Sequence, residues 1–230
     1  MPVPVINRIK ETLFTLATKT LLKIYLTPQK LQEFQGLRLL LLPGCFPPLR
    51  TVTTELLSIA LTAIPLSAGR AVDVGCGPGS LTLLLAGKGF YAVGTDVSVT
   101  CLKAARVNAI RNGVYSLTDF VACDAGSCLR SGSAGVCVTN PPFLPYERKD
   151  DRDLPLAGGR ELEVFKAMVR DCYRVAKKRG WALFAVSDLA SGKPPHSLGV
   201  VLARGRGLGD NIYVVLLKPG AYRSSESAQP

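Results

Sequence analysis

The amino-acid sequence predicts an α/β fold: a mostly parallel sheet of seven strands whose last strand is antiparallel, with helices on both faces. From residue 51 onward, short apolar segments alternate with longer segments of helical periodicity. The short segments, such as 134–139 (AGVCVT) and 181–186 (WALFAV), are nearly continuous apolar runs, as strands buried on both faces are. A glycine-rich segment over 75–79 joins one strand to the next helix, which is typical of the ligand-binding end of such a sheet.

The elements follow from periodicity and from helix stop signals. Residues 5–26 have helical spacing that ends at Pro28, and a short strand over 37–44 and a loop over 45–50 come next. Residues 196–218 hold one further helix or strand and the final strand. The other expected helices cover 51–64, 79–89, 97–113 and 161–180, and the other expected strands cover 70–75, 90–96, 118–124, 134–140 and 181–187.

These elements predict three regions. Residues 1–48 form an N-terminal helix and strand extension, 49–222 form a single sheet domain, and 223–230 (RSSESAQP) form a disordered tail. No apolar stretch is long enough to span a bilayer, and the N-terminus does not read as a signal peptide. We therefore expect a cytoplasmic protein with no membrane partner.

Charge and cysteine content restrict the classes of protein. A net charge of +11 and a pI near 9.5 indicate a polyanionic or acidic partner, or a generally basic composition. The seven cysteines include no Cys-x-x-Cys pair, and His196 is the one histidine. This argues against a zinc site and against histidine-dependent hydrolases. Most cysteines should be small buried apolar side chains, and a Cys123–Cys128 disulfide is conceivable only in a hyperthermophile.

The segment VDVGCGPGS, residues 72–80, leads from a strand through a glycine loop into a helix. Gly75, Gly77 and Gly79 allow positive φ and let a ligand approach the backbone, and the helix N-terminus offers free N–H groups. The spacing differs from the GxGxxG dinucleotide fingerprint. Because Asp73 would repel a diphosphate, the loop better suits a ligand that carries an ammonium group.

Two further carboxylates end the next two strands. Asp96 follows Asp73 by about 20 residues, where an acidic side chain can accept hydrogen bonds from both hydroxyls of a ribose. Asp124 could accept from the exocyclic amine of adenine, and the N–H of Ala125 could reach its ring. Each aspartate could instead be a helix N-cap. The coincidence at successive strand ends favours a ligand site.

Together, residues 70–217 resemble the class I S-adenosylmethionine-dependent methyltransferases, which share a Rossmann-like sheet. The resemblance implies S-adenosylmethionine as the cofactor, with its cationic amino-acid end near Asp73, and it implies no metal. The residues expected to bind the cofactor are Thr51, Asp73, Gly75, Cys76, Gly77, Gly79, Asp96, Val97, Asp124, Ala125 and Asn140.

A rigid motif, Asn140-Pro141-Pro142-Phe143, follows the fourth strand of the sheet domain. Each proline fixes its own φ and restricts the residue before it, so the loop keeps one shape. The Asn140 side-chain oxygen and a backbone carbonyl could then accept both hydrogens of an –NH₂ group, while Phe143 stacks on the planar group behind it. Catalysis would be mostly positioning and would need no histidine base. An ordinary strand exit stiffened by proline is the alternative.

The motif is similar to the Asn-Pro-Pro-Tyr/Phe signature of enzymes that methylate planar amines. Downstream, Ala157-Gly158-Gly159 and Glu163-Val164 resemble the HemK-like glutamine methyltransferases of class 1 release factors. Upstream, Phe46-Pro47-Pro48 resembles the aromatic-x-Pro segment of their short archaeal and eukaryotic branch. Two segments depart from the family: Leu49-Arg50-Thr51 stands where Glu-Asp-Thr is usual, and Arg160-Glu161-Leu162 follows the two glycines.

This resemblance implies a reaction and partners. The catalytic residues would be Asn140, Pro141, Pro142 and Phe143, and the substrate would be the glutamine of the Gly-Gly-Gln loop of a release factor. A small zinc-containing activator subunit is a candidate partner in that branch.

Two other functions stay open. The net charge and the basic segments 148–152 (RKDDR), 177–180 (KKRG) and 203–207 (ARGRG) favour an RNA or DNA methyltransferase that acts on the amine of adenine or guanine. A non-catalytic cofactor-binding protein is the third reading, and the intact Asn140 and both prolines argue against it.

Overall fold

The computed structural model describes residues 30–48, 51–64, 69–188, 195–207 and 210–217. The helix expected over 5–26 and the tail expected over 223–230 lie outside these residues. Among the described residues, no helix has the length and apolar character that crossing a membrane requires.

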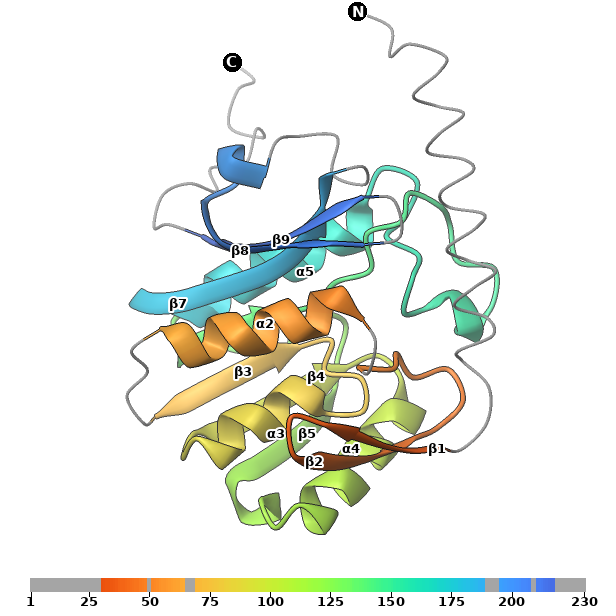
Figure 1. Cartoon of the computed structure of the whole chain (residues 1–230), viewed down its shortest axis with the longest axis vertical. Helices are drawn as coiled ribbons and strands as arrows, with labels where there is room; N and C mark the ends of the chain where they lie inside the picture. Colours follow the sequence, from red (N-terminus) through yellow and green to blue (C-terminus); the bar gives the residue numbers. More distant parts are fainter. Residues whose placement is uncertain (1–29, 49–50, 65–68, 189–194, 208–209, 218–230) are drawn as a thin grey trace, which may run out of the picture.

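Seven strands form one sheet in the order β5-β4-β3-β6-β7-β9-β8 (Figure 1). The strands β5, β4, β3, β6 and β7 run parallel to one another, and β9 lies between β7 and β8 and runs antiparallel to both. The predicted fold class, including the antiparallel last strand, is confirmed, and the segment left open between helix and strand is β8. The bounds are β3 (Arg70–Val74), β4 (Tyr91–Asp96), β5 (Thr118–Ala122), β6 (Ala134–Thr139), β7 (Ala176–Ser187), β8 (Val200–Arg206) and β9 (Asn211–Leu216).

Helices cover both faces of this sheet (Figure 1). On one face lie α2 (Val52–Ala63), α3 (Ser80–Gly87) and α4 (Val99–Arg111), and on the other lies α5 (Glu163–Val175). Short 3₁₀ turns lie between these elements: η1 (Tyr115–Leu117), η2 (Asp151–Asp153) and η3 (Pro195–Ser197).

Side chains of β3 point alternately to the two faces of the sheet. They contribute to the apolar core on each face and place one carboxylate, that of Asp73, at the cavity end. Ala71 packs with Leu57 of α2 and Leu85 of α3, whereas Val72 and Val74 pack against the opposite face, under α5. Since successive residues of a strand point to opposite faces, Asp73 points to the α3 side. A carboxylate is therefore buried near the carboxyl end of β3, an interior strand of the sheet.

The prediction of a helix over 161–180 was wrong at its C-terminal end, because α5 stops at Val175. The apolar face of α5 consists of Phe165, Met168, Val169, Cys172 and Val175. The next position on that face would place a charged side chain, Arg179, against the sheet. Instead Ala176 pairs with Ala134 and begins β7, so strand pairing overrides the helix-forming lysines at 177 and 178.

The sequence interpretation missed a hairpin at the start of the described chain, since only its second strand was expected. β1 (Lys30–Phe34) pairs antiparallel with β2 (Leu37–Leu41). The turn between them, Gln35-Gly36, has positive φ at both residues (50° and 78°), which is the hairpin turn that matches strand twist. The signal was present as a Gln-Gly pair between apolar residues.

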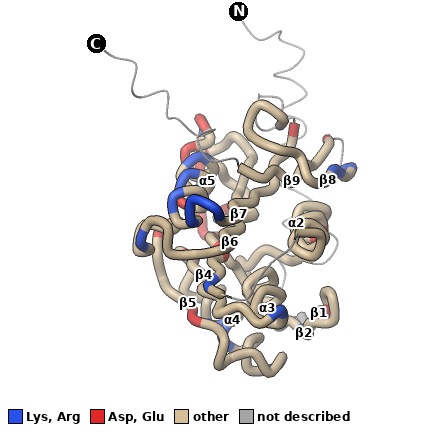
Figure 2. The backbone as a smooth tube through the Cα atoms, turned by 90° about the vertical axis from the view of Figure 1, so that its left-hand side faces the viewer, with Lys and Arg blue, Asp and Glu red and all other residues tan. Residues whose placement is uncertain are grey.

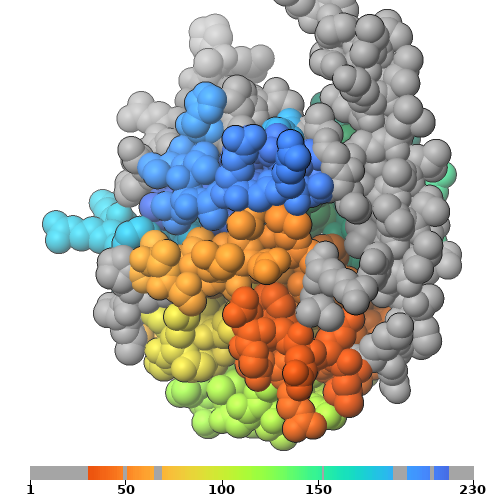
Figure 3. All heavy atoms as spheres, in the orientation of Figure 1, coloured from red at the N-terminus to blue at the C-terminus, as the bar shows by residue number. Residues whose placement is uncertain are grey.

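Asn108 of α4 and Asn112, which caps the C-terminus of α4, hold this hairpin against the domain, where it lies beside α3 and α4 (Figure 3). Asn108 accepts from the N–H of Leu40 at 2.6 Å and donates to its carbonyl at 3.0 Å. Asn112 makes the same pair of bonds to Arg38, at 2.9 and 3.0 Å. The side-chain amides thus stand in for a third strand, because an amide offers the same donor and acceptor as the backbone.

Basic residues gather along α5 and at the start of β7 (Figure 2). Lys177, Lys178 and Arg179 are exposed there, in the segment of β7 where the register against β6 shifts. This end of the sheet is its amino end. The loops that carry the predicted site lie at the carboxyl end.

Candidate functional site

A cavity of about 420 Å³ opens at the carboxyl ends of the parallel strands. The structure brings nearly all predicted site residues to its wall, although they come from five separate segments. The predicted residues that line it are Thr51, Asp73, Gly75, Cys76, Gly77, Asp96, Val97, Asp124, Ala125, Asn140, Pro141, Pro142 and Phe143.

Gly79 is the predicted residue that does not line the cavity. Its φ of 88° places it as the left-handed N-cap of α3. A Cβ at this position would lie 2.9 Å from Leu83 Cδ1 and 3.1 Å from Ala105 Cβ. Gly79 therefore serves the turn into α3 and the close packing of α3 on α4.

The glycine loop presents its backbone to the cavity. The N–H groups of Gly75 and Cys76 both donate to the carbonyl of Thr95 at 2.8 Å, which ties the loop to β4. Gly77 has a φ of 54° and open space where a side chain would be. A ligand can approach the main chain closely at this point.

Asp73 is the most deeply buried carboxylate of the cavity wall, with 2% of its surface exposed. Its Oδ2 accepts hydrogen bonds from the N–H of Thr82 at 3.0 Å and from the Thr82 hydroxyl at 2.7 Å. Burial raises the pKa of Asp73 to about 7, and the charge of Asp96 adds to this, while the bonds from Thr82 oppose it. A cation bound nearby would stabilise the ionised form.

Asp96 fixes the loops on either side of it. Its Oδ2 accepts from the N–H of Gly77 and its Oδ1 from the N–H of Ser98, both at 2.8 Å. Burial raises its pKa. The N-cap of α4 is Ser98, whose hydroxyl accepts from the N–H of Cys101 at 3.3 Å, so Asp96 does not cap this helix. Its carboxylate remains at the cavity wall.

Asp124 and Ala125 line the side of the cavity beside β5. Asp124 is exposed, and a turn instead of a helix follows it, so it caps no helix either. Ala125 has a positive φ of 48°, and its carbonyl accepts from the Thr95 hydroxyl at 2.7 Å. The strained backbone of Ala125 is thus held in place from β4.

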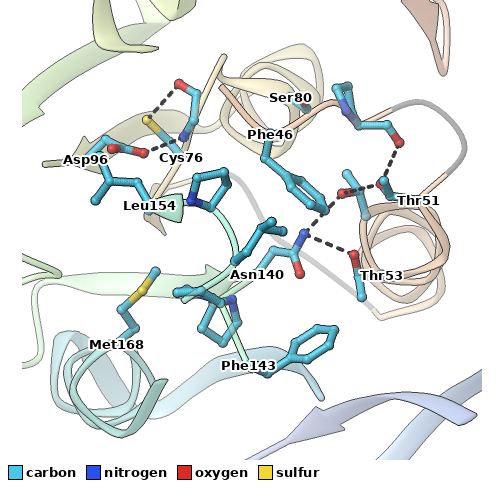
Figure 4. A pocket seen from close by; sticks show the side chains of 18 of the residues that line it. Phe46, Thr51, Thr53, Cys76, Ser80, Asp96, Asn140, Phe143, Leu154 and Met168 are labelled. Atoms are coloured by element: carbon cyan, nitrogen blue, oxygen red, sulfur yellow. Dashed lines mark hydrogen bonds between the residues drawn. The ribbon is translucent and has the colours of Figure 1, made fainter. Parts of the chain in front are cut away.

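The Asn140 side chain has a defined orientation (Figure 4). Its Nδ2 donates to the hydroxyl oxygens of Thr53 and Thr54, at 3.2 and 3.1 Å. Within the described part of the chain the hydrogen bonds of this side chain are those two from Nδ2, and its Oδ1 points away from the two threonines (Figure 4). A carbonyl oxygen is therefore available as an acceptor beside Phe143.

The Ala157-Gly158-Gly159 segment lies directly against the proline motif. The N–H of Gly158 donates to the carbonyl of Leu144 at 2.9 Å, and the N–H of Leu144 donates to the carbonyl of Leu156 at 3.2 Å. A Cβ on Gly158 would be 2.8 Å from the carbonyl of Pro142. Only a glycine fits here, because the two backbones approach closely. The contact brings together the Asn-Pro-Pro-Phe motif and the Ala-Gly-Gly segment, which the sequence interpretation treated as separate motifs.

Several cavity residues were missed by the sequence interpretation, including Thr53, Thr54, Met168, Arg206 and Asp210. No spacing pattern marks them, since they come from α2, α5, the end of β8 and the β8–β9 connection. The charged residues of the described wall are four carboxylates (Asp73, Asp96, Asp124 and Asp210) and one guanidinium (Arg206). The cavity is acidic in a basic protein, which suits a cationic ligand better than a phosphate.

A disulfide between Cys45 and Cys101 fixes one wall of the cavity. Cys101 lies on α4 and lines the cavity, and Cys45 comes directly before Phe46, which also lines it. The sequence interpretation did not predict this pair, which no spacing pattern marks. The other conceivable pair, Cys123 and Cys128, is reduced, and Cys76, Cys123, Cys137 and Cys172 are buried free thiols.

Reduction of this disulfide should destabilise the protein. Closing a loop between residues 56 positions apart contributes about 4 kcal/mol by loop-closure entropy. We expect the free energy of unfolding in urea to fall by this order when dithiothreitol is present. Thiol titration in denaturant should count five free thiols before reduction and seven after it.

The double variant Cys45→Ala, Cys101→Ala is the control, since its stability should no longer respond to dithiothreitol. A Cys123→Ala variant should respond as the unaltered protein does. Equal stability of the oxidised and reduced forms, with the thiol count confirming reduction, would contradict the expectation.

Comparisons with known proteins find relatives of this chain. The sequence model of the methyltransferase small domain family matches residues 38–154. A release factor glutamine methyltransferase of Bradyrhizobium diazoefficiens is 31% identical over 135 residues, which cover 54% of this chain and 45% of that protein. Ribosomal RNA small subunit methyltransferase C of Alcanivorax borkumensis is 35% identical over 75 residues, which cover 33% of this chain and 22% of that protein. The chain spans about half the length of the release factor methyltransferases it matches.

The fold itself recurs in a solved structure, the T. thermophilus 16S rRNA N2 G1207 methyltransferase in complex with AdoMet and guanosine. It superimposes with a TM-score of 0.59 at 18% identity and covers 83% of this chain and 50% of that chain. At this identity the likeness shows a shared fold.

Proposed function

Because the chain belongs to the methyltransferase small domain family, we propose that it transfers the methyl group of S-adenosylmethionine to the nitrogen of a planar amine. S-adenosylmethionine supplies a methyl group on a cationic sulfonium, which is already a good leaving group. The protein then has to bind the cofactor, align the amine and exclude water.

The acidic wall of the cavity supports this cofactor. The Asp73 carboxylate would bind the ammonium group, Asp96 would accept from the ribose hydroxyls, and Asp124 with the N–H of Ala125 would hold the adenine. Gly75 and Gly77 leave room for the ligand at the backbone. A nucleoside diphosphate would meet Asp73 and Asp96 without a described lysine among the lining residues to balance its charge.

The single observation that carries the choice of an amine is the orientation of Asn140. Both hydrogens of its amide are directed to threonine hydroxyls, so the cavity receives its oxygen. An oxygen acceptor binds a group that carries hydrogen, and an –NH₂ group can offer one hydrogen here and one to a nearby backbone carbonyl. These bonds would align the nitrogen lone pair with the methyl group, with the planar group stacked on Phe143.

For the substrate we propose the glutamine of a release factor. The support is the 31% identical relative named above and the position of Ala157-Gly158-Gly159 against the Pro142 backbone. A side-chain amide is planar and small enough to enter over Phe143. The zinc-containing activator remains a prediction from the resemblance alone, and a cytoplasmic location remains a prediction from the apolar pattern of the sequence.

Methyl transfer to a release factor tests this proposal. Purified protein, tritiated S-adenosylmethionine and the release factor of the same source should give labelled factor, with the label located in the Gly-Gly-Gln peptide by mass spectrometry. The control factor carries Gln→Ala in that loop and should stay unlabelled. Label that survives this substitution would exclude the glutamine as the substrate.

An RNA or DNA amine is the second candidate, supported by the net charge of +11 and by the ribosomal RNA methyltransferase among the relatives. Its binding would weaken steeply with salt, because each neutralised phosphate releases counterions. Within the described chain, the basic segment at the start of β7 lies at the opposite end of the sheet from the acidic cavity, whereas Arg148 and Lys149 are exposed on the loop after Phe143 and Arg206 lines the cavity. The release factor stays the first choice because of the relative named above and the contact of Gly158 with Pro142. Label in total RNA in place of the factor would reverse the choice.

A further inference from the structure

We propose that Thr54, together with Thr51, is a positioning residue that sets the polarity of the Asn140 amide. This inference rests on the proposed function, in which the Asn140 oxygen accepts from the substrate amine. It goes beyond it by naming residues outside the Asn-Pro-Pro-Phe motif that determine which atom of Asn140 the substrate meets.

An asparagine amide needs such a device because its oxygen and nitrogen are nearly equal in size. A turn of the amide by 180° would present two donor hydrogens to an –NH₂ group, which also brings donors. Packing alone does not distinguish the two orientations. Only hydrogen-bond partners that accept and do not donate can fix the amide with its oxygen outward.

A threonine hydroxyl can both donate and accept. The orientation of the Asn140 amide therefore depends on where the proton of each hydroxyl points. The Thr51 hydroxyl lies 2.8 Å from the carbonyl of Pro48 and 3.1 Å from the Thr54 hydroxyl. Because a carbonyl only accepts, the single proton of Thr51 goes to Pro48. The proton between the two hydroxyls is then that of Thr54.

With its proton committed to Thr51, the Thr54 oxygen can only accept from Asn140 Nδ2, at 3.1 Å. Thr53 offers a second acceptor at 3.2 Å for the other amide hydrogen. Thr53 and Thr54 are 5% and 3% exposed, so water does not readily replace either bond. The relay runs from Pro48 through Thr51 and Thr54 to Asn140, and it links the loop that follows Cys45 to the orientation of the amide.

Thr54→Val removes the hydroxyl and keeps the shape of the side chain, whereas Thr54→Ser keeps the hydroxyl. We expect Thr54→Val to lower kcat by about 10- to 100-fold, the cost of a small misplacement of a positioning group, with the cofactor Kd changed less than about threefold. Thr54→Ser should recover most of the loss. Thr62→Val is the matched control, since the Thr62 hydroxyl bonds to Ile59 on the same helix, away from the cavity.

Thr51→Val is the sharper variant, because Thr51 makes no described bond to Asn140. Without Thr51 the Thr54 proton is released and can be donated to Asn140, so kcat should fall although both contacts to the amide remain in place. In an Asn140→Ala background neither Thr54→Val nor Thr51→Val should lower kcat further. Additive losses, or a Thr54→Ser variant as slow as Thr54→Val, would overturn the proposal.

A readout without turnover separates this proposal from the substrate assignment. The Asn140 side-chain NH₂ gives a pair of ¹⁵N–¹H signals, identified by their loss in Asn140→Ala. They should shift in Thr54→Val and Thr51→Val, exchange with water at least about tenfold faster, and stay unchanged in Thr62→Val. Unchanged signals in all three variants would refute the relay. Changed signals in a protein that methylates no amine would retain the relay and refute the function.

Discussion

Asn140→Ala is expected to lower kcat for methyl transfer by about 100- to 1,000-fold, the cost of losing one preorganised polar group at a reacting centre. The affinity for S-adenosylmethionine should stay within about threefold, since Asp73, Asp96 and Asp124 would still hold the cofactor. Titration calorimetry gives the Kd, and single-turnover transfer gives the rate of the chemical step.

Asn112→Ala is the matched control, because Asn112 holds the β1–β2 hairpin and does not line the cavity. It should lower stability and leave the single-turnover rate nearly unchanged. If Asn140→Ala weakened cofactor binding as much as it slowed transfer, the side chain would be a structural part of the cavity wall and its assigned role would be wrong.

Asp73→Asn is expected to have two opposite effects: a higher free energy of unfolding and weaker binding of the cofactor. The folded-state pKa of Asp73 is about 7, above the model-peptide value of 3.8, so the folded state binds more protons between these values. The carboxylate therefore lowers the free energy of unfolding as pH rises from about 4 to about 7, and this loss persists above 7. Removing the charge should raise the free energy of unfolding at pH 8 by a few kcal/mol, at about 1.4 kcal/mol per pKa unit.

The cofactor should show the complementary dependence. An ammonium group prefers the ionised carboxylate, so the Kd of the unaltered protein should rise by up to about tenfold per pH unit below 7. In Asp73→Asn the Kd should be about 10- to 100-fold higher at pH 8 and nearly independent of pH. Thermal unfolding and calorimetry from pH 5.5 to 8.5 measure both effects.

Asp151→Asn serves as the control for this pair of effects, because Asp151 is exposed and does not line the cavity. It should change neither the stability nor the Kd appreciably. A stability that falls in Asp73→Asn would mean that the bonds from Thr82 outweigh the cost of burying the charge.

The part of the cavity wall that lies at the strand ends could be predicted, because the sheet itself brings those residues together. The glycine loop, Asp96, Asp124 and Asn140 each follow a strand, and parallel strands deliver their carboxyl ends to one edge. Gly79 was the exception, since its neighbour is Ala105 of α4, and no local pattern reports a contact across 26 residues. The contact of Gly158 with Pro142 could not be predicted for the same reason, since it joins residues that are distant in the sequence.

The sequence by itself determined the fold class and the residues that end the strands, because apolar periodicity and glycine or proline positions act locally. The tertiary structure alone decided what depends on neighbours far along the chain. It paired Cys45 with Cys101, raised the pKa of Asp73 by burying it beneath α3, and set Asn140 on the hydroxyls of α2. Burial and hydrogen-bond partners are properties of the packed chain, so the chemistry of these groups was settled only when the elements came together.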